Sequence, residues 1–213
     1  YYFCNNHSGM GGKIRTISEL NTSSNESFVS ENSASIFETI GNYSNFSINK
    51  VGDGSSWQIS GSDIGTDTLS GFKRLEFDDG VLALDVGVGD TAGQAYRMYQ
   101  AAFARTPDMP GVAYHMNDME SKGWSIKQIA TNFMASPEFK TKYGESPSDN
   151  DFINLLYENV LGRTPPDADV AWYQERIDSG LYDRPQLLVN FAESPENVTL
   201  VGSAIENGIW LES

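Results

Sequence analysis

The side chains that most often carry catalysis are scarce in this sequence. It has two histidines, His7 and His115, and one cysteine, Cys4. A hydrolytic triad needs a nucleophile and an acid arranged around a histidine. His115 follows Tyr114 in a segment with helical spacing, and a triad there would have to recruit His7 from the N-terminal loop. We therefore expect His115 to be a packing or surface residue, and we predict no catalytic residues and no enzymatic activity.

Aspartates are concentrated in the segment that precedes the helical half of the chain. They stand at Asp53, Asp63, Asp67, Asp78 and Asp79. Carboxylates in Gly/Asp-rich turns are ligands for Ca²⁺, but the calcium-binding nonapeptide G-G-x-G-x-D-x-U-x is absent. Aspartate also caps turns by accepting backbone amide hydrogens. We expect turn caps, with calcium binding as the alternative, in which a chelator would unfold this segment and spare the helices.

The charge balance excludes one class of partner. The 213 residues carry 14 Lys and Arg against 29 Asp and Glu, and the excess is spread along the whole chain. Such a surface repels phosphate backbones, so we expect no nucleic-acid binding. No apolar run reaches the roughly 18 residues of a membrane-spanning helix. We therefore expect no membrane span.

The first third of the chain is expected to contain an arm and a linker. Residues 1–17 begin with a short aromatic segment that leads into a glycine-rich loop, which is typical of a strand followed by a loop. Residues 18–35 are rich in Ser and Asn and carry few large apolar groups. That composition indicates a flexible polar linker.

Residues 36–90 show the alternation of β-strands. Leu75 and Phe77 precede the turn Asp78-Asp79-Gly80, and Leu82 and Leu84 follow it. Apolar residues two apart on both sides of a tight Gly-containing turn predict a β-hairpin. A second turn, Gly52-Asp53-Gly54, separates two further alternating stretches. We expect a small antiparallel β element that packs on the helical segment after it, because so few strands are not stable alone.

The segment from 91 to 213 is expected to be helical and duplicated. From Thr91 the apolar residues fall at helical spacing, and the pattern returns when the sequence is shifted by 58 positions. Without gaps, 13 of 40 positions are identical between residues 99–138 and 157–196. This is more than chance allows, so we infer two copies at about 92–145 and 149–200, each with three or four short helices.

The identical positions lie where a helical unit needs them. The Thr-Pro pairs beginning at Thr106 and Thr164, and the Ser-Pro-Glu triplets beginning at Ser136 and Ser194, are typical of helix starts. Tyr114 aligns with Trp172, and we expect both rings inside their units. Neighbouring copies should stack so that each covers the apolar face of the other.

The two copies also differ. The second lacks the turn expected at Gly111 and carries Pro165-Pro166, and it has Tyr182-Asp183 where the first has Trp124-Ser125. We therefore expect the copies to make different contacts, one towards the β element and one towards a partner. Trp124, Tyr182 and Trp210 are candidates for an interface, although most large aromatics in units this small belong to the core.

Residues 94–143 and 149–197, AYRMYQAAFARTPD…ATNFMASPEF and LLYENVLGRTPPD…LLVNFAESPEN, resemble the DUF4214 helical repeat. Residues 65–85 look like the short β element that precedes this repeat. The family occurs in RTX-type exported proteins, in surface-layer proteins and in structural proteins of marine phages. The resemblance implies secretion or surface exposure and a structural or adhesive role, and it brings no catalytic residues. His115-Met116 departs from the pattern, which usually has an aromatic residue after the tyrosine.

The N-terminal residues Cys4-x2-His7-x2-Met10 resemble the ligand loop of cupredoxins. In that family a thiolate, an imidazole and a long axial thioether from one loop bind copper. A cupredoxin takes a further histidine from an upstream segment, and this sequence begins at Tyr1. The resemblance therefore implies copper bound by Cys4, His7 and Met10 in a longer parent chain. Similar tails in phage structural proteins need not bind copper.

Together these features predict an α+β protein with a flexible N-terminal arm, a small antiparallel β element and an all-helical tandem repeat. We expect a non-enzymatic extracellular protein that assembles in many copies with other structural subunits. A marine phage virion component is favoured slightly over a secreted RTX-type or surface-layer adhesion module. A copper-binding electron-transfer fragment remains the alternative from another class.

Overall fold

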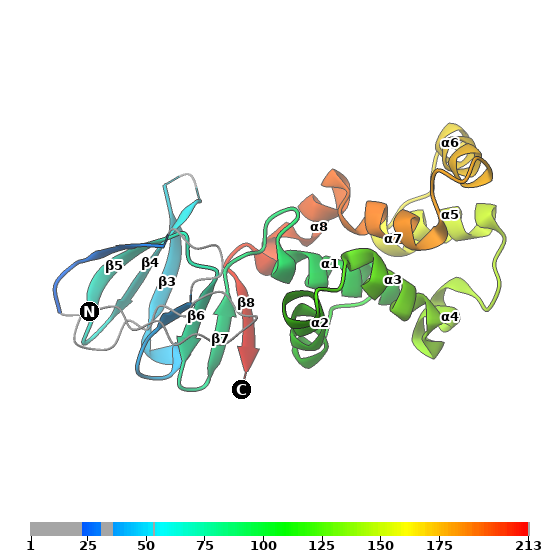
Figure 1. The fold of residues 1–213 in the computed structure, drawn as a ribbon. Coiled ribbons are helices and arrows are strands. Elements are labelled where there is room, and N and C mark those ends of the chain that lie inside the picture. Colours follow the sequence, from blue (N-terminus) through cyan, green and yellow to red (C-terminus); the bar gives the residue numbers. More distant parts are fainter. Residues whose placement is uncertain (1–22, 31–35, 53, 213) are drawn as a thin grey trace. The chain divides into compact units, whose positions relative to one another are not determined.

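The computed structural model describes residues 23–30, 36–52 and 54–212 (Figure 1). It divides the chain into two compact units. The β unit comprises Tyr1–Val86 together with Ile205–Ser213, and the helical unit comprises Gly87–Ala204. Strands build the first and helices the second, which confirms the predicted α+β class. The predicted arm, residues 1–17, lies outside the described residues.

The first sheet of the β unit has the strand order β1-β5-β4-β3. Its strands are β1 (Ser27–Val29), β5 (Gly65–Ser70), β4 (Ser56–Gly61) and β3 (Ser47–Val51). β3 and β4 pair antiparallel on the two sides of the predicted turn. Gly54 has a φ of +87°, a conformation that glycine adopts without strain. Trp57, Ile59 and Leu69 point from these strands into the core of the unit.

The second sheet has the strand order β2-β6-β7-β8. Its strands are β2 (Ile36–Glu38), β6 (Arg74–Phe77), β7 (Gly80–Ala83) and β8 (Ile209–Glu212). The predicted hairpin is confirmed, with Leu75 opposite Leu82 in β6 and β7. A Cβ atom at Gly80 would lie 2.5 Å from the carbonyl oxygen of Leu211, so glycine is what lets β8 approach this closely.

The sheets are mixed, whereas the sequence predicted an antiparallel element. β1 pairs in parallel with β5, and β2 pairs in parallel with β6. β1 lies inside the predicted linker, residues 18–35, where Phe28 packs against Phe37 with ring centroids 5.3 Å apart. The prediction was wrong there because a three-residue strand shows too little alternation to stand out in a polar segment.

β8 lies at the end of the segment that was predicted to be wholly helical. It pairs with β7, so the chain leaves the β unit after β7 and returns to it only after the helical unit. Trp210 of β8 stacks on Tyr43 with ring centroids 4.4 Å apart. Tyr43 begins the short 3₁₀ helix η1 (Tyr43–Asn45). The helical unit is therefore an insertion between two neighbouring strands of one sheet.

The described helices form two sets of four. The first set is α1 (Thr91–Phe103), α2 (Met109–Lys122), α3 (Ile126–Ala135) and α4 (Pro137–Tyr143), and the second is α5 (Asp149–Leu161), α6 (Asp167–Asp178), α7 (Arg184–Ala192) and α8 (Pro195–Ile205). Each helix of the second set begins 58 positions after its counterpart. Of these helices, none is both long and apolar enough to cross a membrane.

Helix starts follow the expected serines but not the expected threonines. The hydroxyl of Ser136 accepts a hydrogen bond from the amide of Phe139, and Ser194 serves the amide of Asn197 in the same way, at 3.2 Å in both cases. The prediction for Thr106 was wrong, because Asp108 is the N-cap of α2 and accepts from the amide of Gly111 at 2.8 Å. A carboxylate two residues further on thus sets the start of this helix.

Two further expectations are corrected in the helical unit. Thr164 does not cap α6, which starts after Pro166 without a side-chain cap. Gly111 was expected in a turn, yet it lies inside α2. A Cβ atom at Gly111 would lie 2.6 Å from a ring carbon of Tyr99. The glycine is therefore needed for close packing of α2 on α1 and does not mark a chain reversal.

The two sets share one core. α3 packs against its counterpart α7, and α1 contacts α5 and α7. The counterpart residues Phe133 and Phe191 are both buried in the same cluster. Because α3 faces α7 and α1 faces α5, each set covers an apolar face of the other.

A buried ion pair also joins the two sets. The guanidinium of Arg97 in α1 donates to both carboxylate oxygens of Glu193, which follows α7, at 2.7 and 2.8 Å. It also donates to the carbonyl oxygen of Gly87 at 2.9 Å. The Arg97 side chain is only 1% exposed and that of Glu193 is 13% exposed. Such a pair is costly to break, because either charge alone would be left buried.

Candidate functional site

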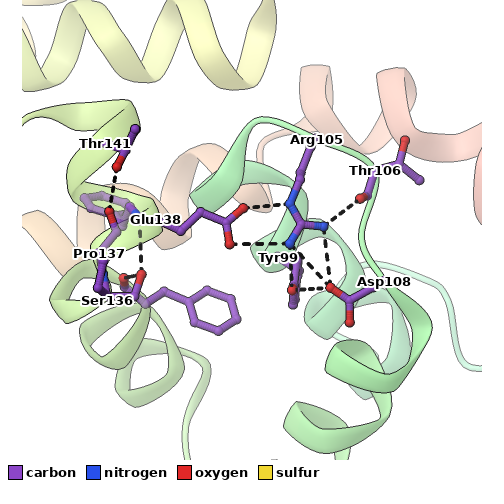
Figure 2. Close-up of polar contacts among 10 residues, drawn as sticks. Tyr99, Arg105, Thr106, Asp108, Ser136, Pro137, Glu138 and Thr141 are labelled. Atoms are coloured by element: carbon purple, nitrogen blue, oxygen red, sulfur yellow. Dashed lines mark hydrogen bonds and ion pairs between the residues drawn. The ribbon is translucent and has the colours of Figure 1, made fainter.

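Arg105 connects three elements of the first set (Figure 2). Its Nε donates to Glu138 Oε1 at 2.7 Å, and a terminal nitrogen lies 3.4 Å from Glu138 Oε2. The same terminal nitrogen donates to the hydroxyl of Tyr99 at 3.0 Å and contacts Asp108. We call Tyr99, Arg105, Asp108 and Glu138 the first clasp. It joins α1, the start of α2 and the first turn of α4.

Local sequence places each part of the first clasp. Ala104 ends α1 in a left-handed conformation with a φ of +50°, which turns the chain towards Arg105. Asp108 is held at the N-cap of α2, and Glu138 lies in the first turn of α4, just after Ser136 and Pro137. Negative side chains are favoured at these positions because helix N-termini carry partial positive charge.

The second set contains an equivalent group, the second clasp, made of Tyr157, Arg163, Asp169 and Glu196. Arg163 binds Glu196 with both nitrogens of its fork, at 2.6 and 2.8 Å. Its guanidinium carbon lies 4.8 Å from the ring centroid of Tyr157, close to the 5.0 Å that separates Arg105 from Tyr99. The hydroxyl of Tyr157 donates to Asp169 at 2.9 Å.

The clasps differ in where the carboxylate comes from. In the first, the hydroxyl of Tyr99 donates to Asp108, and the helical position of Gly111 is left without a side chain. In the second, the counterpart of Asp108 is Pro166, and the counterpart of Gly111 is Asp169. The tyrosine hydroxyl therefore has a carboxylate partner in both clasps, although the aspartate that provides it lies at a different position in each.

Contacts within the clasps shift the pKa values of several of their side chains. Burial and the neighbouring Asp108 raise the pKa of Tyr99, and burial and Asp169 raise the pKa of Tyr157. The hydrogen bond from Tyr99 lowers the pKa of Asp108, and the hydrogen bond from Arg163 lowers the pKa of Glu196. At neutral pH these tyrosines therefore stay protonated and these acids stay ionised.

His115 lies in α2 beside a buried carboxylate. Its Nδ1 is 3.3 Å from Asp118 Oδ2, and Lys122 donates to the other oxygen of Asp118 at 2.6 Å. The imidazole also packs on the ring of Phe133 with centroids 4.5 Å apart. Burial lowers the pKa of His115, although Asp118 opposes that effect. These contacts describe a packed, neutral histidine.

Tyr114 and Trp172 are exposed, which corrects the prediction that they lie inside their units. Tyr114 is 58% exposed and Trp172 is 44% exposed. Lys122 Nζ lies 5.3 Å from the rings of both Tyr114 and Trp124. Trp172 carries the guanidinium carbon of Arg176 at 3.2 Å from its ring centroid. Core packing explains neither ring, so each set presents an exposed aromatic side chain associated with a cation.

The other candidate interface aromatics are partly buried. Trp124 and Tyr182 pack against the helical core, and Trp210 packs against the core of the β unit. Trp124 and Tyr182 occupy counterpart positions, and Tyr182 lies 6.3 Å from Trp172 between ring centroids. The first set thus has Tyr114 and Trp124 at the positions where the second has Trp172 and Tyr182.

The residues predicted to bind copper lie outside the part of the chain that the structure describes. They are Cys4, His7 and Met10, and Asp53 of the β unit lies outside it as well. Within the described ranges, no group of three or more His, Cys, Asp or Glu side chains is arranged to hold a metal ion.

Three aspartates of the β unit accept backbone amides from distant segments, whereas the sequence predicted local turn caps. Asp67 accepts from the amide of Glu26, and Asp78 accepts from the amide of Gly41, both at 3.0 Å. Asp79 accepts from the amide of Tyr43 at 2.8 Å. These bonds join segments that lie more than thirty residues apart in sequence. The carboxylates therefore fasten distant loops to the hairpin and to β5.

Sequence reasoning missed the partners within the clasps and the partner of His115. The three-residue spacing from His115 to Asp118 places both on one helix face and could have revealed that contact. Arg105 and Glu138 are identical to their counterparts Arg163 and Glu196, and this identity was not interpreted as an ion pair. A charged pair retained in both copies is a usable signal for a contact.

Residues 130–201 match the family described as "Domain of unknown function (DUF4214)". The match runs from within α3 to within α8, so it contains the whole of α4 to α7. It includes the second clasp and Trp172. No curated protein matches the chain.

Proposed function

We propose that this protein is a non-catalytic assembly component that acts through contacts with other protein subunits. The observation that carries the proposal is the pair of exposed aromatic side chains at counterpart positions, Tyr114 and Trp172. Aromatic residues that the core does not need are typical of the centres of protein interfaces. Their presence in both sets gives the helical unit two similar contact points.

The polar groups of the helical unit support the same proposal. The clasps, the Arg97–Glu193 pair and Asp118 are all occupied by partners within the fold. Both tyrosines, together with Asp108 and Glu196, have pKa values displaced away from neutrality, whereas general acid–base catalysis requires values near it. The contacts of these residues hold the helices of the unit together.

Within this class we propose a virion component, following the resemblance to the helical repeat of marine phage structural proteins. A secreted RTX-type or surface-layer adhesion module is the alternative. Both place the protein outside the cytoplasm and in many copies. The acidic net charge of −15 suits a protein in salty surroundings.

Cross-linking of purified source material tests the proposal. Lys122 is suitable for an amine-reactive linker because its side chain is 46% exposed and its ammonium lies beside Tyr114. We expect mass spectrometry of intact particles to find links from Lys122 to another protein subunit at fixed stoichiometry. Recovery with virions supports the virion component, and recovery with the cell surface supports the alternative. A protein that is free in both fractions and gives no links contradicts assembly.

A further inference from the structure

A groove of about 330 Å³ lies in the helical unit between the end of α1, α5 and α8. Its volume is near the lower limit of small-molecule sites, about 300–1,000 Å³, so it suits one side chain and the backbone next to it. Part of its wall is apolar and consists of Ala104, Pro107, Leu200, Val201 and Ala204. Leu200 is 57% exposed, so this apolar wall is open to a partner.

The rest of the wall is polar and contains two unpaired atoms. It consists of Tyr96, Gln100, Arg105, Thr106 and Asn159. The side-chain oxygen of Gln100 and the side-chain nitrogen of Asn159 are shielded from solvent, and within the described residues neither makes a hydrogen bond. A buried polar atom without a partner is costly. The groove therefore has one acceptor and one donor to satisfy.

Of these two atoms, the acceptor on Gln100 is the stronger signal. Burial raises the pKa of Tyr143 and Asn159 opposes that rise, so the amide of Asn159 has a polar neighbour. The hydroxyl of Tyr143 already donates to the carbonyl oxygen of Ala101 at 2.7 Å. A peptide group complements both atoms, because its N–H donates to an acceptor and its carbonyl oxygen accepts from a donor.

The loop between α6 and α7 presents such a peptide group. We call residues 179–182 the Leu181 loop. The amides of Gly180 and Tyr182 donate to the carbonyl oxygens of Ile177 and Arg176 at 2.9 and 3.0 Å. The amide and carbonyl of Leu181 make no hydrogen bond within the described residues, and its side chain is 65% exposed. The loop thus holds an aliphatic side chain and a free peptide group out to solvent.

Charge also complements the two surfaces. Asp178 and Asp183 flank the Leu181 loop. The groove is lined by one cation, Arg105, and by no carboxylate among the described residues that line it. The Arg105 side chain is 39% exposed. Opposite charges therefore meet at the edge of a contact between the loop and the groove.

The loop and the groove lie apart and are not repeated in the other set. Gln100 has Glu158 as its counterpart, and Leu181 has Gly123. In Figure 1, α6 and α8 lie at opposite ends of the helical unit. Each chain therefore offers one loop and one groove on different surfaces. A contact between the loop of one copy and the groove of another is head-to-tail.

We propose that the groove binds the Leu181 loop of a second copy of this chain. The side chain of Leu181 packs on Leu200 and Val201, and its peptide group pairs with Gln100 and Asn159 after small rotations of these two amides. The inference rests on the proposed assembly function and names one partner for it. It uses a surface other than the exposed aromatic side chains.

Sedimentation velocity of the full chain over a range of concentrations tests the proposal. We expect the wild type to associate reversibly. Leu181→Gly, which installs the residue of the first set, and Ala204→Arg, which fills the groove, should each weaken association by about tenfold or more. An equimolar mixture of these two variants should form a dimer and nothing larger, because one supplies the intact groove and the other the intact loop. Circular dichroism and melting temperature establish that each variant is folded.

The matched control is Val88→Ala, since Val88 is 67% exposed and belongs to neither surface. It should leave association unchanged, and a loss equal to that of Leu181→Gly overturns the proposal. A mixture of the two variants that stays monomeric while the wild type associates also overturns it. So does a Gln100→Leu variant that is more stable and associates as well as the wild type, because the unpaired oxygen is then a structural defect only.

A wild type that stays monomeric at every concentration overturns the proposal as well. If that monomer binds the acetylated tetrapeptide amide Ser-Gly-Leu-Tyr in calorimetry, the occupant is another protein and not a second copy. Links from Lys122 to a different subunit persist in either case. Failure of this contact is therefore distinguishable from failure of the proposed assembly function.

Discussion

The first helical set supplies the carboxylate of its clasp from the N-cap of α2, whereas the second supplies it from inside α6. Asp108 serves Tyr99 in one, and Asp169 serves Tyr157 in the other. The arginine–glutamate pair of each clasp is unchanged, and the tyrosine hydroxyl is satisfied in both. The buried tyrosine hydroxyl thus needs a partner in both sets, while the position of the residue that provides it along the helix differs.

The two sets are alike in their shared core and differ at other positions. Residues in the shared core keep their apolar character, as with Phe133 and Phe191. Some residues on the first two helices of each set do not keep that character. Tyr96 and Met116 of the first set correspond to Asn154 and Gln174 of the second. The core common to both sets constrains one face of each helix, and the other face has diverged.

The largest expected effect concerns the buried ion pair of Arg97 and Glu193, which joins the two sets. Glu193→Ala leaves Arg97 charged and buried, so we expect the free energy of unfolding to fall by about 3–5 kcal/mol. Urea unfolding followed by circular dichroism measures the loss. The counterpart positions hold Leu155 and Ala135.

The matched variant of this pair carries those counterpart residues. The double substitution Arg97→Leu with Glu193→Ala removes both charges, and it should recover most of the stability that Glu193→Ala loses. A double variant as unstable as the single one would show that the pair does not act as a buried charge pair.

Two substitutions transfer the arrangement of the second clasp to the first. Gly111→Asp adds a side chain whose Cβ atom would lie 2.6 Å from a ring carbon of Tyr99 and 2.8 Å from Asp108 Oδ1. We expect a loss of about 1–3 kcal/mol from overpacking and charge repulsion. Adding Asp108→Pro recreates the second set and should restore at least part of the loss in urea unfolding. If both variants are equally unstable, the two carboxylate positions are not interchangeable.

The third prediction concerns the residue that follows α1 and α5. Ala104 has a φ of +50°, and its counterpart Gly162 has a φ of +67°. A Cβ atom at Gly162 would meet no atom within 4 Å, so only the backbone conformation opposes a side chain there. We expect Ala104→Gly to stabilise and Gly162→Ala to destabilise, each by about 1 kcal/mol. Midpoints of urea unfolding that shift in the same direction for both variants would contradict this.

The smallest expected effect is the pH dependence of the second clasp. Arg163 lowers the pKa of Glu196, so the stability that Glu196 contributes is present above its ordinary pKa and is lost as the pH falls through the lowered value. Both side chains are about two-fifths exposed, at 41% and 42%, so solvent screens the pair. Glu196→Gln should lower the melting temperature by less than about 2 °C near pH 7. That difference should shrink below about pH 4, and a constant difference would rule out this titration.

Sequence reasoning succeeded where the determining signal is local. The hairpin of Leu75 and Leu82 is visible because alternation and a turn residue occur within a few positions. The helix starts at Ser136 and Ser194 were identified because capping depends on residues three apart. The helices of the second set also begin where the 58-residue shift of the sequence pattern predicts them.

It failed where the structure depends on distant partners. Phe28 becomes part of a strand only because it pairs with Leu69 of β5, 41 positions further on, and its own segment is too short to show a pattern. Tyr114 and Trp172 look like core residues, but the orientation of α2 and α6 about their axes is set by tertiary packing. Asp169 could not be recognised as the partner of Tyr157, since its counterpart is a glycine.

The pairing of β7 with β8 has a consequence for synthesis of the protein. Ala83 and Ile209 are partners, although 126 positions separate them. A nascent chain therefore exposes the edge of β7 until the entire helical unit has left the ribosome, because β8 follows that unit in the sequence. Closing so long a loop is slow. Early folding of the inserted helices would bring their two ends together and shorten the search that completes the sheet.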